Sequence, residues 1–475
     1  MNRPIRKVAV LAALLFFALL ANITYFPLFR ADALANDPAN RRVRDAQFAQ
    51  NRGAILVGNT PIASSVPDKG VFAYQRVYTD GPMWAPVTGY YSYEFGRTGL
   101  EQTYNAELAG TSDSQFLTRL MDTLSGRQRE GASIITTLNA KAQKAAWDAL
   151  GSMQGAVVAL NYRTGAVLAM VTKPSYDPNR LASVDLTKAS DAWNSLKDAT
   201  GSPMANRATQ EIYPPGSTFK LVTAAAALEN GMSPETQVDA PLRLKLPGTN
   251  TYLPNETNCG GTRISLIQAF AVSCNTAYAN VGLGLGADKL RAQADAFGFG
   301  KPLGLGFTTA ASHFPVSPNE PETALSAIGQ YDVAASPLQM AVVAGGIAND
   351  GVVMQPYLVQ EVRSPSLQVL ESTTPKKLSQ AMTAQHAHEE QRMMQAVVTS
   401  GTGTRAQVPG VTIGGKTGTA QTIPSRPPYA WFVGYAQQPD VAIAVFIESV
   451  NIPRNDIAGG ALAGPVFAAV VKALQ

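Results

Sequence analysis

The sequence Tyr213-Pro-Pro-Gly-Ser-Thr-Phe-Lys220 leads directly into an alanine-rich run that ends at Asn230-Gly231. Proline and glycine set a sharp entry, and Ser217 falls in the first turn of the helix that this pattern predicts. Ser217 and Lys220 are three residues apart, so they share one helix face. A serine hydroxyl is a poor nucleophile until a base takes its proton, and a desolvated lysine with a depressed pKa can be that base. The stretch therefore predicts a serine nucleophile with a lysine base. The alternative is an ordinary helix-start serine beside a surface lysine.

A second polar element is Gly414-Gly-Lys-Thr-Gly-Thr419, which has the composition of a strand. Side chains alternate along a strand, so Thr417 and Thr419 are expected on one face and Lys416 and Gly418 on the other. Gly418 would leave space for a ligand backbone to lie alongside. Two hydroxyls and a nearby ammonium are suited to a substrate carboxylate. The alternative is an exposed edge strand with no ligand.

The third element is Ser273-Cys-Asn275, within a stretch of helical pattern that begins at Ser265. Ser317-Pro-Asn319 has the same form, but it lies among prolines that favour a turn. The order and spacing relative to Ser217 and Lys416 favour Ser273-Cys-Asn275 as the functional copy.

Around these elements the main domain begins and ends with strand patterns. The strands expected are 156–161, 166–171, 411–421, 430–435 and 441–448, followed by a helix over 459–474. Between them lie helical patterns that include 217–230, 265–283 and 337–349. The sequence thus predicts one sheet built from both ends of the domain, with mostly helical material inserted.

The N-terminus predicts a membrane span. Only 15% of the 475 residues are charged, against about 25% in typical soluble proteins. Arg3, Arg6 and Lys7 supply three of the four net positive charges and directly precede an uncharged run from Val8 to Phe29. That run is long enough to cross a bilayer, and the flanking cations favour a cytoplasmic N-terminus. The alternatives are a signal peptide cleaved after Ala33-Leu-Ala35 and a buried core helix. Because the rest of the chain is nearly neutral, it lacks the excess of positive charge that would indicate nucleic-acid binding.

Residues 37–52 look like a helical stem after the span, and 53 to about 131 carry short β-like runs of a small accessory domain. From 133 to 150 the spacing becomes helical. The accessory domain has an aromatic cluster that we interpret as core more than as a ligand platform. Its members are Trp84, Tyr90, Tyr91, Tyr93 and Phe95.

The two cysteines, Cys259 and Cys274, would lie outside the membrane, where a disulfide is permitted. Two free thiols, with Cys274 buried, are the alternative. A metal site is not expected, because neither cysteine has a CxxC partner and the chain has only three histidines. No cofactor is expected either.

Ser217-Thr-Phe-Lys, Ser273-Cys-Asn and Lys416-Thr-Gly, in this order, resemble the active-site motifs of penicillin-binding proteins and serine β-lactamases. Further stretches resemble class B penicillin-binding proteins and extend the likeness over nearly the whole chain, most of all to the short PbpA type of actinobacteria. These stretches are Arg52-Gly53, Gly89-Tyr-Tyr-Ser92, Gly99-Leu-Glu101, Thr137-Leu-Asn139, 155–179, Asn206-Arg207, Ile328-Gly-Gln330, Ser336-Pro-Leu-Gln339 and Gly401-Thr-Gly-Thr404. The resemblance implies an α+β fold, with an antiparallel sheet flanked by helices and a mostly helical subdomain.

The resemblance also implies a role for each motif residue. Ser217 would attack the carbonyl between the terminal D-alanines of a peptidoglycan stem peptide, and Lys220 would take its proton. Ser273 and Lys416 would pass the proton to the leaving D-alanine, while Asn275 would bind the donor amide. The strand residues Thr417, Gly418 and Thr419 would bind the substrate and its carboxylate. Backbone N–H groups of Ser217 and Thr419 would form the oxyanion hole.

The implied organisation is a cytoplasmic tip and anchor (1–30), a stem and accessory domain (31–150) and a transpeptidase domain (151–475). Its ligands would be stem peptides and β-lactams, and the family suggests a membrane glycosyltransferase partner. One departure is Tyr331, where the family has glycine after Gly329-Gln330. The alternatives are a β-lactamase or sensor of the same superfamily, and a scaffold without catalysis.

Overall fold

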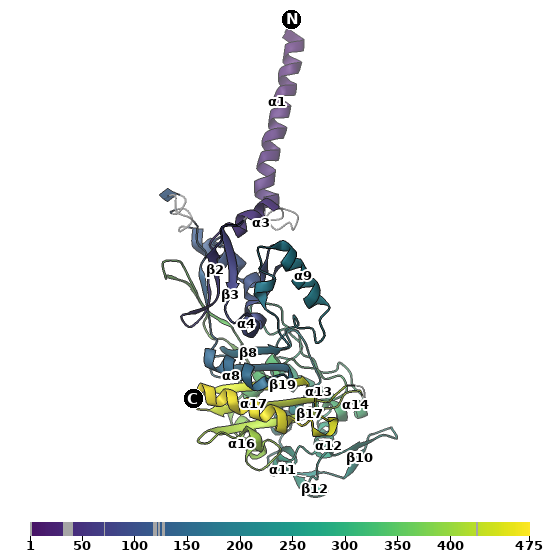
Figure 1. Ribbon diagram of the computed structural model, residues 1–475. Coiled ribbons are helices and arrows are strands. Elements are labelled where there is room, and N and C mark those ends of the chain that lie inside the picture. Colours follow the sequence, from purple (N-terminus) through teal and green to yellow (C-terminus); the bar gives the residue numbers. More distant parts are fainter. Residues whose placement is uncertain are drawn as a thin grey trace.

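The computed structural model describes residues 2–31, 41–70, 72–116, 121, 124–125, 129–423 and 426–475. Its N-terminal helix α1 (Asn2–Tyr25) continues as η1 (Phe26–Arg30) and projects away from the rest of the molecule (Figure 1). The helical segment Arg3–Arg30 contains an 18-residue window with a mean hydropathy of 2.3, none of it buried, so its length and composition suffice to cross a membrane. Part of the expected stem, 37–40, lies outside the described residues, and the rest includes α3 (Arg41–Phe48).

The accessory domain is built on a six-stranded sheet of order β15-β14-β6-β1-β2-β3. Strand β1 pairs with β6 in parallel, and the other pairs are antiparallel. Two of its strands come from far along the chain, which the sequence did not predict. The strands are β1 (Ile55–Val57), β2 (Thr60–Pro67), β3 (Tyr74–Tyr78), β6 (Ser133–Thr136), β14 (Val359–Arg363) and β15 (Val369–Ser372). The smaller elements beside it are α4 (Gly81–Thr88), β4 (Tyr91–Ser92), β5 (Gly96–Arg97), α5 (Gly99–Thr103), α6 (Asn105–Leu108) and η2 (Asp113–Gln115).

A buried ion cluster joins the first residues of this domain to its helices. Glu101 accepts from Arg52 Nε at 2.6 Å and from Arg76 Nε at 2.7 Å, and all three side chains are buried. Most of the aromatic cluster is core, as expected: Trp84, Tyr90, Tyr91 and Tyr93 are buried, and Phe95 is half-buried against the core cluster that contains Tyr90.

The main domain has a five-stranded antiparallel sheet of order β17-β18-β19-β7-β8, so strands from both ends of the domain pair as expected. Both of its faces are covered by helices, because its central strands are apolar on both sides. In β19, Ala442, Ala444 and Phe446 lie in the core formed with α10 and α15, while alternate residues lie in the core formed with α8 and α17. Figure 1 shows α8 and α17 beside this sheet. The strands are β7 (Gln154–Asn161), β8 (Val167–Lys173), β17 (Thr412–Ala420), β18 (Tyr429–Gln437) and β19 (Val441–Ser449). The four helices are α8 (Ala140–Leu150), α10 (Lys220–Glu229), α15 (Pro337–Ala348) and α17 (Gly459–Leu474).

The material inserted between these strands is mixed. It contains η3 (Pro178–Arg180), α9 (Leu186–Lys197), η4 (Gly216–Phe219), α11 (Leu266–Ala271), α12 (Asn275–Leu285), α13 (Ala287–Ala296), α14 (Glu320–Ser326), α16 (Ala384–Thr399) and η5 (Thr404–Ala406). It also contains the short strands β9 (Gln237–Asp239), β10 (Arg243–Lys245), β11 (Tyr252–Pro254), β12 (Arg263–Ser265), β13 (Val352–Met354) and β16 (Lys377–Gln380), and η6 (Arg454–Asp456) precedes α17.

Two predictions of continuous helix were wrong. The stretch 133–150 starts as strand β6, because Ser133–Thr136 pairs with β1 and β14 before α8 begins. The stretch 265–283 breaks between α11 and α12, where Ser273 has a left-handed φ of 60°.

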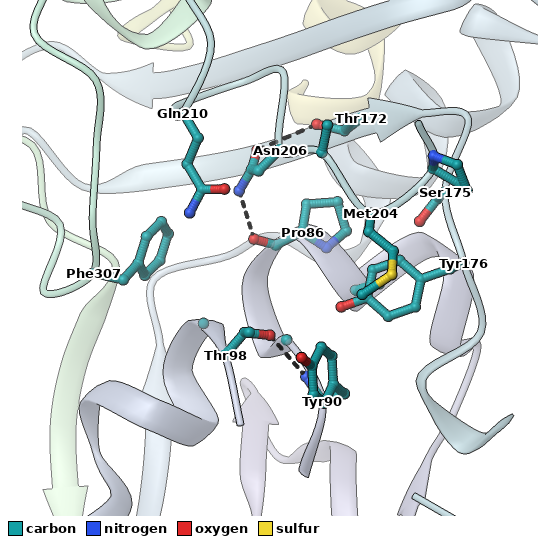
Figure 2. A pocket seen from close by; sticks show the side chains of 15 residues that line it. Pro86, Tyr90, Thr98, Thr172, Ser175, Tyr176, Met204, Asn206, Gln210 and Phe307 are labelled. Atoms are coloured by element: carbon teal, nitrogen blue, oxygen red, sulfur yellow. Dashed lines mark hydrogen bonds between the residues drawn. The ribbon is translucent and has the colours of Figure 1, made fainter. Parts of the chain in front are cut away.

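The accessory and main domains meet at a pocket in which Asn206 makes the central contacts (Figure 2). Asn206 Nδ2 donates to the carbonyl of Pro86 in α4 at 2.9 Å, and its Oδ1 accepts from Thr172 Oγ1 in β8 at 3.3 Å. One buried amide therefore ties an accessory helix to an edge strand of the main sheet.

Candidate active site

The Ser217 turn is held by two glycines with left-handed backbone. Gly216 has φ 53° and donates its N–H to the carbonyl of Gly329 at 3.0 Å; Gly329 has φ 73°. A Cβ at Gly329 would lie 2.1 Å from Gly216 O, so only glycine permits this approach. Ser217 sits in the 3-10 turn η4 and is 9% exposed. The expected single helix is thus a 3-10 turn followed by α10.

Lys220 begins α10 and is fully buried. Its Nζ lies 3.0 Å from Ser217 Oγ and 3.2 Å from Ser273 Oγ. It also lies 2.9 Å from the Ser273 carbonyl oxygen and 2.8 Å from Asn275 Oδ1. Burial, and then the positive charge of Lys416, hold the pKa of Lys220 well below its usual value, against an opposing effect of Glu256. The first two motifs therefore meet at one nitrogen.

Lys416 approaches from β17 and is also buried. Its Nζ donates to Ser273 Oγ at 2.8 Å and to the Thr417 carbonyl at 3.0 Å. Burial lowers the pKa of Lys416 to about 7, although the negative charge of Glu256 raises it. The Ser273 hydroxyl thus lies between the two lysines.

Two aromatic rings lie beneath these ammonium groups. Lys220 Nζ is 5.7 Å from the ring centre of Tyr278, and Lys416 Nζ is 5.6 Å from that of Phe270. The two rings are themselves 5.8 Å apart. Cation–π attraction at these distances partly offsets the cost of burying a charged lysine.

Thr417 and Thr419 point to one side of β17, where they line a pocket with Thr402 and Arg405 that we call the threonine pocket. Thr402 Oγ1 lies 2.6 Å from Thr417 Oγ1. A Cβ at Gly418 would lie 2.9 Å from Thr218 Cγ2, so this glycine makes room for the Ser217 turn. That it also leaves space for a ligand backbone stays a prediction.

A second pocket lies on the other side of Ser217 and is lined by Asn275 and by apolar side chains that include Leu253, Leu325 and Ile328. We call it the apolar pocket. Tyr331 lines this pocket and has φ 61°. The residue that replaces the family's glycine therefore still has the left-handed backbone that glycine favours.

The structure joins Cys259 and Cys274 in a disulfide, which ties the loop after β11 to the start of α12. The second Ser-x-Asn copy, Ser317-Pro-Asn319, lies outside the site: its Asn319 caps α14 and accepts from the Glu322 N–H at 3.0 Å.

The sequence analysis missed Glu256, which lines both pockets beside Ser217. No motif contains it. The sequence analysis also gave Thr402 no role, although Gly401-Thr-Gly-Thr404 is one of the stretches that resemble class B penicillin-binding proteins.

Comparisons with known proteins agree with this geometry. Residues 155–472 match the family described as "Penicillin binding protein transpeptidase domain", and 52–134 match "Penicillin binding protein A dimerisation domain". The chain belongs to the class B penicillin-binding proteins. It is 43% identical over 487 residues to Peptidoglycan D,D-transpeptidase PbpA of Mycolicibacterium smegmatis, covering 100% of this chain and 99% of that one.

Solved structures of penicillin-binding protein A from M. tuberculosis are also similar. The ceftriaxone acyl-enzyme complex has a TM-score of 0.87 at 38% identity, covering 91% of this chain and 100% of that chain. The imipenem acyl-enzyme complex has a TM-score of 0.86 at 40% identity, covering 90% and 100%. This penicillin-binding protein therefore has the fold of relatives that form acyl-enzymes with β-lactams.

Proposed function

We propose that this protein is a peptidoglycan D,D-transpeptidase that cross-links stem peptides through an acyl-enzyme on Ser217. The observation that carries the proposal is the position of Lys220 Nζ, 3.0 Å from Ser217 Oγ and in contact with two atoms that can only accept hydrogen bonds.

The hydrogen-bond inventory accommodates a neutral Lys220. A neutral amine has two N–H donors and one lone pair. The donors serve the Ser273 carbonyl and Asn275 Oδ1, which leaves the lone pair for the hydroxyl proton of Ser217. Burial and the charge of Lys416 act in the same direction by lowering the pKa of Lys220. Lys220 is thus suited to act as the base that activates Ser217.

In acylation, Ser217 Oγ attacks the carbonyl between the two terminal D-alanines. Its proton passes to Lys220 and then, through the Ser273 hydroxyl and Lys416, to the departing amine of D-alanine. The new C–O bond forms as the C–N bond breaks, and backbone N–H groups of Ser217 and Thr419 stabilise the oxyanion. Thr417 and Thr419 hold the terminal carboxylate in the threonine pocket, while Asn275 binds the donor amide. These assignments follow the contacts described above and the family motifs.

In the second half-reaction, an amine of a neighbouring stem peptide attacks the ester. A C–N bond forms, the C–O bond to Ser217 breaks, and the amine proton returns to Ser217 Oγ through Lys220. A β-lactam that imitates the donor terminus forms the corresponding ester and blocks the site.

We assign the anchor to 1–30, the stem and accessory domain to 31–150 and the transpeptidase domain to 151–475. Two exchanges cross these bounds: α8, at the end of the second segment, packs on the main sheet, and β14 and β15, within the third, belong to the accessory sheet. The apolar N-terminal helix and its preceding cations support a single-pass membrane protein with a cytoplasmic N-terminus and an extracytoplasmic catalytic domain. A membrane glycosyltransferase that makes the glycan strands is the proposed partner, on family grounds.

The test is labelling of the full chain in detergent with fluorescent penicillin, with Ser217→Ala as the control. Stable labelling that requires Ser217 is expected. Rapid release of the label would instead indicate a β-lactamase or a related hydrolase, and absence of labelling would favour a scaffold.

A further inference from the structure

Glu256 lies where the two pockets meet. Three residues line both the threonine pocket and the apolar pocket: Ser217, Thr419 and Glu256. The first is the proposed nucleophile, and the second lies on β17 beside the oxyanion. Glu256 is exposed, and none of the hydrogen bonds assigned to acylation above involves it, so its carboxylate at this junction is free for another role.

The position of Glu256 is set by anchored neighbours. Asn255 Oδ1 accepts from the N–H of Thr276 in α12 at 2.9 Å, and Thr257 Oγ1 donates to the carbonyl of Val272 at 2.8 Å. Gln421 Nε2 donates to Glu256 Oε1 at 3.2 Å. The residues on both sides of Glu256 are thus pinned to the segment that carries Ser273, and the Cys259–Cys274 disulfide closes the same loop. A carboxylate held in this way loses little freedom when a ligand binds.

The two pockets differ in the charged side chains that line them. Among the described residues that line the apolar pocket, Glu256 is the one with a charged side chain, whereas the threonine pocket also has Arg405. A substrate carboxylate is therefore favoured beside Arg405 and the threonines, and a cation beside Glu256. The negative charge of Glu256 also raises the pKa of Lys220 and of Lys416, against the effect of burial, which is consistent with its closeness to the reacting groups.

The incoming amine has to reach this junction. The departing nitrogen lies between the carbonyl at Ser217 and the carboxylate in the threonine pocket, and the acceptor amine takes the same place. A primary alkyl amine is protonated at neutral pH, because its pKa is about 10.

We propose that Glu256 binds the ammonium group of the acceptor stem peptide and so selects an amine over water for the second half-reaction. This inference rests on the proposed transpeptidase function and names its acceptor-binding residue. Recognition forms and breaks no covalent bond at Glu256, and the ammonium releases one proton to solvent before the amine attacks.

The test uses the full chain in detergent, acylated by a thioester of an N-acyl-D-alanine, with two nucleophiles. One is a synthetic stem peptide with a free primary amine on a side chain, which is cationic; the other is hydroxylamine, which is uncharged at neutral pH. For Glu256→Gln we expect the acceptor-peptide KM to rise about tenfold, as for loss of a charge-assisted hydrogen bond. Because the loss of this charge also lowers the pKa of Lys220 and of Lys416, it changes penicillin labelling and transfer to both nucleophiles by a common factor. The deciding quantity is therefore the ratio of kcat/KM for the peptide to the rate constant for hydroxylamine, which should fall about tenfold.

Glu371→Gln, at an exposed position on β15 in the other sheet, is the matched control and should leave every parameter unchanged. An unchanged KM for the peptide in Glu256→Gln would overturn the proposal. An equal loss with hydroxylamine would also overturn it, because Glu256 would then act on the acyl-enzyme itself. A wild-type chain that penicillin does not label would refute the transpeptidase function, and the acceptor site with it.

Discussion

Removing the Ser273 hydroxyl separates two properties of this residue. Its Oγ accepts from Lys416 Nζ at 2.8 Å and lies 3.2 Å from Lys220 Nζ, while its backbone has a left-handed φ of 60°. Ser273→Ala removes the hydroxyl and keeps the strained backbone. Ser273→Gly removes the hydroxyl and relieves the strain.

The magnitudes follow from these two features. A hydrogen bond to a charged group is worth about 1.5 to 3 kcal/mol, and about 1.4 kcal/mol is a factor of ten in rate. Acylation should therefore fall about tenfold to a hundredfold in both variants. A left-handed backbone costs a residue with a Cβ about 1 kcal/mol more than glycine. The free energy of unfolding of Ser273→Gly should thus exceed that of Ser273→Ala by about 1 kcal/mol.

The assays are stopped-flow acylation with a chromogenic β-lactam and urea unfolding followed by tryptophan fluorescence. Acylation within a factor of three of the wild type would refute the bridging role of the hydroxyl. Equal stability of the two variants would refute the left-handed backbone at this position.

Three further predictions concern charge and cross-linking. The pH profile of kcat/KM for acylation should be bell-shaped: it should rise as Lys220 loses its proton and fall as Lys416, with a pKa of about 7, loses its proton. In Lys416→Arg, whose side chain stays charged, the activity that remains should not fall at high pH. Replacing Cys259 and Cys274 by serine should lower the free energy of unfolding by about 3 kcal/mol, as expected for a loop of this size; in thermal unfolding, dithiothreitol should lower the Tm of the wild type and leave that of the variant unchanged. Glu101→Gln should destabilise the accessory domain by about 3 to 5 kcal/mol, because two buried arginines lose their counter-charge; limited proteolysis should then cut this domain first.

Local patterns were enough for much of the fold. The continuous apolar runs of β7, β8, β18 and β19 and the turn residues between β7 and β8 predicted a sheet built from both ends of the domain, because apolar runs and turn composition are properties of neighbouring residues. The pairing of β14 with β6 was missed because it joins residues more than two hundred positions apart, and short strands of mixed polarity carry no signal for a distant partner.

The candidate site was predictable to a similar extent. Ser217, Lys220, Ser273 and Lys416 were found because each lies in a short motif, and the structure brings them together. Glu256 was missed, since its place beside Ser217 depends on how Asn255 and Thr257 attach their loop to the α11–α12 segment. No pattern in the residues around Glu256 reports that attachment.

The break at Ser273 shows why helical spacing failed where the chemistry is concentrated. In a continuous helix the carbonyl of Ser273 would be directed along the helix axis toward a backbone N–H four residues later. At φ 60° the helix is interrupted, and this carbonyl instead accepts from Lys220 Nζ at 2.9 Å while the side chain of the same residue accepts from Lys416. One residue can therefore contact both lysines only because the helix is interrupted there. A local strain of about 1 kcal/mol is small beside the two hydrogen bonds that it permits, one of them from the charged Lys416.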